Sequence, residues 1–149
     1  MNLVFLGDNE HQSLHSQQVA TLEQRGLEPA VLSWGLSDLS IFQELQQQPS
    51  PVTLLASRHG SVPATIWTSR NPGRVRRLVL LHPSLHLGLP QQALPAPHFV
   101  PTLVVVNSKE FHPAADQIAI LAGKFFHDYA LHITSESAEL KDTLSLLAF

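Results

Sequence analysis

The sequence contains no cysteine, little charge and no long hydrophobic run. Without thiols the chain cannot form a disulfide or a zinc–thiolate site, so a metal could be held only by histidines and carboxylates. Charged residues make up 14% of the chain and the net charge is −3, which gives no electrostatic basis for binding nucleic acid. No apolar stretch approaches the roughly 20 residues that cross a bilayer, and the N-terminal segment does not resemble a signal peptide. We therefore expect a cytoplasmic protein that binds neither nucleic acid nor membranes.

The hydrophobic residues, 44% of the chain, fall into short runs that alternate with helical patterns. Such a composition in 149 residues predicts one folded domain spanning residues 1–149. Apolar or β-branched runs predict six strands, at residues 2–7, 28–34, 52–56, 75–82, 102–108 and 129–134. Helical patterns follow these runs, at about residues 13–25, 39–48, a segment ending near 70, 113–126 and 137–149. The proline-rich segment 83–101 is interpreted as a surface excursion.

Continuous apolar strands separated by helices predict a parallel sheet covered on both faces, that is, a three-layer α/β/α fold. The carboxyl ends of parallel strands share one edge of the sheet, where ligands bind in such folds. The sequence places five segments at this edge: Gly7–Asp8, Trp34–Gly35, Ser57–His59, His82–Ser84 and Asn107–His112.

The central stretch "VTLLASRHGSVPAT", Val52 to Thr65, runs from an apolar strand through a small-residue turn into a helical pattern. With the following "NPGRVRRLVLLHP" it resembles the central segment of α/β-hydrolases, and "LVFLGDN" and "VPTLVVVNSKEFHP" resemble two further segments of that family. The resemblance implies a truncated α/β-hydrolase-like fold with about six mostly parallel strands. It also implies a nucleophile elbow, the strained strand-to-helix turn that lifts a catalytic side chain above the sheet.

The alignment with the elbow motif G-x-S-x-G puts Ala56 and Gly60 at the two glycine positions and Arg58 at the nucleophile. Ser57 and His59 take the variable positions. The small residues that the turn needs are therefore present, but a guanidinium carries a fixed charge and has no nucleophilic lone pair.

The other two members of a catalytic triad are also incomplete. The resemblance implies an acid near residues 107–110, where Glu110 is the carboxylate, and a histidine after the last strand, where none follows Ile133. A relocated serine mechanism would need a base and an orienting group nearby. Ser84 with His82, or Ser57 with His112 and Glu110, are conceivable combinations, and the spacing selects neither.

Arg58 itself has three interpretations at the start of a helix. It could pair internally with Asp8 or Glu110, its guanidinium could join the helix N-terminus in a site for a small anion, or it could be exposed to solvent. A metal site built from His82, His86 and a carboxylate such as Asp8 or Glu110 is a further alternative. The remaining histidines are interpreted as surface residues without a function, among them His11, His15, His98 and His127. We expect no metal and no cofactor.

These observations favour a non-catalytic binding or regulatory module. Its candidate ligand-binding residues are Gly7, Asp8, Arg58, His59 and His82. The alternative is a hydrolase with relocated residues that acts on a small ester or thioester. A homo-oligomer or a protein partner is a further possibility, with the terminal "LLAF" and the proline-rich segment as candidate surfaces.

Overall fold

The computed structural model describes residues 2–35, 38–87, 99–110, 113–134 and 139–147. Six strands form one sheet, namely β1 (Asn2–Asp8), β2 (Ala30–Trp34), β3 (Val52–Ser57), β4 (Val75–Leu81), β5 (Thr102–Asn107) and β6 (Tyr129–Thr134). The α-helices are α1 (Gln12–Gln24), α2 (Ser40–Gln46), α3 (Ser61–Arg70), α4 (Ala115–Phe125) and α5 (Glu139–Leu146). Short 3₁₀ turns connect several of them, namely η1 (Asn9–His11), η2 (Arg58–Gly60), η3 (Pro72–Arg74) and η4 (Leu85–Leu87).

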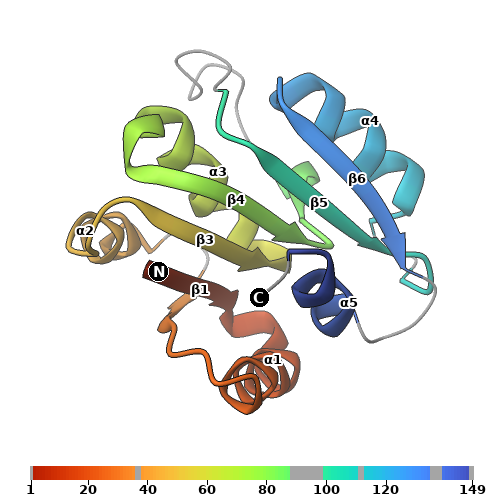
Figure 1. Cartoon of the computed structure of the whole chain (residues 1–149). Helices are drawn as coiled ribbons and strands as arrows, with labels where there is room; N and C mark the ends of the chain where they lie inside the picture. Colours follow the sequence, from red (N-terminus) through yellow and green to blue (C-terminus); the bar gives the residue numbers. More distant parts are fainter. Residues whose placement is uncertain (1, 36–37, 88–98, 111–112, 135–138, 148–149) are drawn as a thin grey trace.

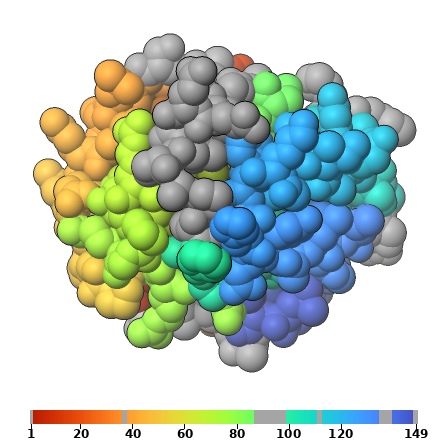
Figure 2. Space-filling model, turned by 90° about the horizontal axis from the view of Figure 1, so that it is seen from above, coloured from red at the N-terminus to blue at the C-terminus, as the bar shows by residue number. Residues whose placement is uncertain are grey.

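The sheet has the order β2-β1-β3-β4-β5-β6, and every pair of neighbouring strands is parallel. Strands β2 and β6 are therefore the edges of the sheet. Because the sheet has these two edges, the β2–α2 region (orange) lies at one end of the molecule and the α4–β6 region (blue) at the other, as Figure 2 shows. The predicted α/β fold with about six parallel strands is confirmed.

Each face of the sheet has its own hydrophobic core, because side chains alternate along a strand. On one face Leu54 and its neighbours pack against α2, α3 and α4, with Trp67 and Ile118 among the buried residues. On the other face Leu55 and its neighbours pack against α1 and α5 through Leu22 and Leu144. Three helices thus cover one face and two the other, which gives the three layers seen in Figure 1.

Several element boundaries differ from those expected. Strand β4 ends at Leu81, so His82, which was expected inside the strand, lies in the loop that follows. Helix α4 begins at Ala115 and not near Pro113, because Ala114 is still extended (φ −68°, ψ 152°). Helix α2 begins at Ser40, whose backbone N–H donates to the Asp38 carboxylate (2.9 Å) as in an Asx turn.

Most of the proline-rich segment lies outside the described residues, so its interpretation as a surface excursion stays a prediction. Within the described part of the chain, none of the helices combines the length and the apolar character that a membrane span needs.

Candidate functional site

The turn after β3 has the backbone geometry of an elbow. Arg58 has a φ of +49°, in the left-handed region that non-glycine residues rarely adopt. Gly60 follows at a point where the chain passes close to β1, and a Cβ there would lie 2.5 Å from the carbonyl oxygen of Leu6 and 2.8 Å from that of Gly7. The sharp turn and the glycine at the close approach thus place residue 58 directly after the carboxyl end of β3.

The side chain of Arg58 is turned inward and paired. Its Nη2 donates to Oε1 of Glu110, in the loop after β5, and its Nη1 donates to the Ser57 hydroxyl (3.4 Å). Only 5% of the Arg58 side chain is exposed. Of the two carboxylates considered from sequence, Glu110 is thus the one that forms this ion pair. A small anion at Arg58 would have to compete with this carboxylate.

His82 is a buried link between the loop after β4 and the loop after β5, and it also has a positive φ, of +42°. Its Nδ1 accepts a hydrogen bond from the backbone N–H of Asn107 (3.1 Å), so this network assigns the ring proton to Nε2. Nε2 lies 3.1 Å from the carbonyl oxygen of Pro113 and 3.4 Å from Oε2 of Glu110. Both ring nitrogens are therefore engaged, and His82 ties the loop after β4 to the segments around Asn107 and Pro113.

The serines near the elbow join this network. The Ser61 hydroxyl donates to the carbonyl oxygen of Arg58 (2.6 Å) and accepts from the backbone N–H of Ser84 (3.1 Å). The same N–H of Ser84 lies 3.2 Å from the carbonyl oxygen of Arg58. Within the described residues, the hydrogen bonds of the Ser57 and Ser61 hydroxyls thus involve Arg58 and Ser84 and no histidine. His112, the other candidate base, lies outside the described residues.

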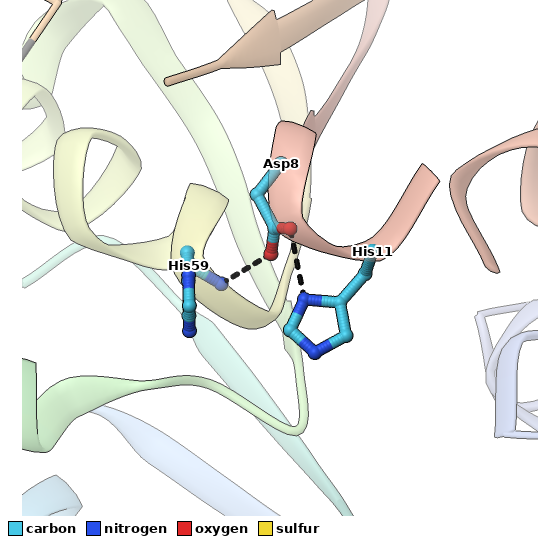
Figure 3. A group of neighbouring side chains, drawn as sticks. All are labelled: Asp8, His11 and His59. Atoms are coloured by element: carbon cyan, nitrogen blue, oxygen red, sulfur yellow. Dashed lines mark hydrogen bonds and ion pairs between the residues drawn. The ribbon is translucent and has the colours of Figure 1, made fainter. Parts of the chain in front are cut away.

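A second polar group gathers around Asp8, the last residue of β1 (Figure 3). Its buried carboxylate accepts from the His59 backbone N–H through Oδ2 (2.7 Å), and Oδ1 lies 2.8 Å from Nδ1 of His11. The His11 and His59 rings meet edge to face with their centroids 5.1 Å apart. Three residues from two loops are thereby brought together at the carboxyl ends of β1 and β3.

Two of the nine histidines contradict the interpretation as plain surface residues. His11 contacts Asp8, and His15 is half-buried, with its ring 5.3 Å from that of Phe5. Burial lowers the pKa of His15 below its usual value, and the negative charge of Asp8 opposes this shift in part. His127 is exposed as expected and stacks on Phe99, and His98 lies outside the described residues.

A cavity of about 470 Å³ lies at the other end of the strands. It is lined by residues of the amino-terminal parts of β5 and β6, together with Arg77 and the end of α5. It is therefore separate from the two polar groups at the carboxyl edge.

Neither the scan of protein-family models nor the search of curated proteins gives a match. Solved structures do match. Est1E from Butyrivibrio proteoclasticus with ferulic acid bound has a TM-score of 0.66 at 11% identity, over 99% of this chain and 86% of that one. A YdeN-like hydrolase from Pectobacterium atrosepticum has a TM-score of 0.65 at 19% identity, over 99% and 89%. The α/β-hydrolase domain-containing protein 10 from mouse has a TM-score of 0.65 at 13% identity, over 99% and 88%.

This chain has the α/β-hydrolase fold. Identities of 8–19% establish the architecture and leave the activity to be argued from the site. The turn after β3 is the one that the sequence resemblance aligns with the elbow, and its left-handed residue is Arg58. The fold expected from the resemblance is confirmed, and the chemistry of its site is a separate question.

Sequence reasoning placed Gly7, Asp8, Arg58, His59 and His82 at one edge of the sheet, but the structure divides the polar side chains between two groups. Arg58 and His82 belong with Glu110, whereas Asp8 belongs with His11 and the His59 backbone. The sequence interpretation missed His11. Its position three residues after Asp8, in a segment just beyond a buried strand, was the available signal.

Proposed function

We propose that this protein is an α/β-hydrolase-fold binding or regulatory module that works without the usual catalytic triad. The observation that carries the proposal is Arg58. It holds the left-handed nucleophile position of the turn and is ion-paired with Glu110. A guanidinium cannot attack a carbonyl carbon.

The partners of Arg58 support the same proposal. Glu110, the candidate acid, neutralises the guanidinium, and His82 uses both ring nitrogens for hydrogen bonds inside the protein. A general base must be able to take a proton from a nucleophile within hydrogen-bond reach. Because Arg58, Glu110 and His82 are hydrogen-bonded or ion-paired within the protein, they are better suited to forming a rigid binding surface than to transferring protons.

The ligand class that suits this edge is a small anion. It would bind beside Arg58 by displacing Glu110 from one side of the guanidinium, with backbone N–H groups near the start of α3 as further donors. A second copy of the chain or another protein is the alternative occupant of the same edge.

The competing proposal is a hydrolase with relocated residues that acts on a small ester or thioester. Two observations favour it: the matching structures include esterases and lipolytic enzymes, and Ser57, Ser61 and Ser84 all lie next to the elbow. Such an enzyme would need a base other than His82 in its present hydrogen bonds.

Labelling with a fluorophosphonate probe distinguishes the two proposals. The purified, folded protein is incubated with the probe beside a known serine hydrolase and read by intact mass and peptide mapping. The binding-module proposal expects no adduct. An adduct on Ser57, Ser61 or Ser84 that the matching serine-to-alanine variant abolishes would establish an activated serine and overturn the proposal.

A further inference from the structure

The Asp8 group lies at the point where the strand order reverses. From β1 the chain moves outward to β2 and then returns to β3 on the other side of β1. In open parallel sheets the loops diverge at such a point, and ligands bind in the crevice outside the strand ends. Asp8 ends β1, His11 lies in η1 directly after it, and His59 lies in η2 after β3. Both loops of this crevice therefore contribute a side chain to one group.

The geometry of the group resembles a set of metal ligands. One nitrogen or oxygen atom from each of Asp8, His11 and His59 lies within 4.8 Å of the other two. Figure 3 shows the two imidazole rings on either side of the Asp8 carboxylate. The backbone N–H of His59 donates a hydrogen bond to the carboxylate, so the position of the carboxylate does not depend on a metal.

The present contacts leave the group incompletely satisfied. Among the described residues, Nδ1 of His59 is buried and has no hydrogen-bond partner. Buried polar nitrogens nearly always have a partner, and a bound ion is one group that would supply it. The side-chain partner of the buried Asp8 carboxylate is the imidazole ring of His11. A bound cation would satisfy the His59 ring and neutralise the carboxylate at once.

We propose that Asp8, His11 and His59 form a binding site for a divalent transition-metal ion, and that Zn²⁺ suits it best. Two imidazoles and one carboxylate are a ligand set typical of zinc and unsuited to calcium or magnesium. Three protein ligands leave a fourth position for water or for an oxygen of an anionic ligand. The site goes beyond the proposed function and does not depend on what Arg58 does.

Closing the site requires only a small movement. Ligand atoms bound to zinc at about 2.0–2.1 Å lie about 3.3 Å from one another in a tetrahedron. The ligand atoms here lie within 4.8 Å of one another, so any pair that is farther apart than about 3.3 Å has to move closer. His11 can supply this movement, because its side chain is 41% exposed and it lies in a short 3₁₀ turn. Asp8 and His59 stay fixed by the hydrogen bond between them.

The test is metal binding by the untagged full chain after treatment with a chelator. Isothermal titration with ZnCl₂ measures affinity and stoichiometry, and titration with CoCl₂ reports coordination through the visible absorption of the ion. The proposal expects one ion per chain and a cobalt spectrum typical of a four- or five-coordinate site. Loss of one ligand in His11→Ala or His59→Ala should weaken zinc binding by more than about tenfold.

His127→Ala is the matched control, because it removes an exposed histidine far from Asp8 in the sequence and should leave the affinity unchanged. Asp8→Asn keeps an acceptor for the His59 N–H and tests the carboxylate if alanine variants fold poorly. Absence of stoichiometric binding overturns the proposal. So does binding that His11→Ala and Asp8→Asn leave unchanged, or that His127→Ala weakens equally.

Discussion

At the scale of single residues, the ion pair between Arg58 and Glu110 makes a measurable contribution to stability. Glu110→Ala removes the carboxylate partner of a buried guanidinium, and a hydrogen bond to a charged group contributes about 1.5–3 kcal/mol. We expect the free energy of unfolding, measured by urea titration, to fall by about that amount. Acetate or phosphate should restore part of the loss by replacing the missing carboxylate.

The matched control for this pair removes both charges. Arg58→Met with Glu110→Gln keeps much of the side-chain volume and leaves no isolated charge, so it should cost less than Glu110→Ala alone. Acetate should not stabilise this double variant. If acetate stabilises wild type, double variant and Glu110→Ala equally, the effect is a general salt effect and the buried pair is not its cause.

Gly60 is a residue whose lack of a side chain is required by a close approach. A Cβ there would press against the carbonyl oxygens of Leu6 and Gly7. Relieving such a backbone clash costs about 1–3 kcal/mol, so Gly60→Ala should lower the midpoint of urea unfolding. Gly73→Ala, where the new Cβ meets nothing within 4 Å, should be neutral or slightly stabilising. Equal effects of the two substitutions would contradict this account.

At the scale of elements, helix α4 attaches to the sheet by one face. Ile118 is fully buried in the core beneath α4, whereas Ile120 on the same helix is 63% exposed. Ile118→Ala should lower the free energy of unfolding by about 2–5 kcal/mol because it leaves a cavity in the core. Ile120→Ala should change it by less than about 0.5 kcal/mol. A similar cost for both, measured by chemical denaturation, would mean that α4 is packed differently.

The sequence predicts the elements well where one physical signal dominates. Strand β3 was found because its apolar run is bounded by Pro51 and by the small residues around Gly60. It predicts boundaries less well where tertiary contacts decide them. His82 continues the apolar pattern of β4, but its ring is recruited by the Asn107 backbone N–H and leaves the strand.

The sequence predicted which edge of the sheet carries the candidate site, but it did not predict which side chains pair with one another there. A parallel sheet brings the ends of its strands together, so Asp8 and Arg58 could be placed at one edge from topology alone. Which acid pairs with Arg58 depends on how the loop after β5 folds, and this depends on contacts distant in sequence. His11 was missed because it was interpreted as one of several surface histidines, although it lies three residues after Asp8 and just beyond a buried strand.

At the scale of the whole molecule, the stability of the fold is expected to depend on the protonation of one half-buried histidine, His15. Helix α1 covers the face opposite α3, and His15 of this helix packs its ring against Phe5 of β1. Because burial lowers the pKa of His15 in the folded state, the unfolded chain binds a proton more readily just below the usual value of 6.5. Stability is therefore highest above that pH and falls as the pH drops from there towards the pKa of the folded state.

The free energy of unfolding of wild type, measured with a chelator present, should thus decrease from about pH 7.5 to about pH 5.5. His15→Gln keeps a polar side chain of similar length but does not titrate, so its decrease over this range should be smaller. The nearby Asp8 charge opposes the shift, so removing it in Asp8→Asn should lower the pKa of His15 further and extend the decrease to lower pH. Identical slopes for wild type and His15→Gln would show that the buried imidazole does not set the acid sensitivity of this fold.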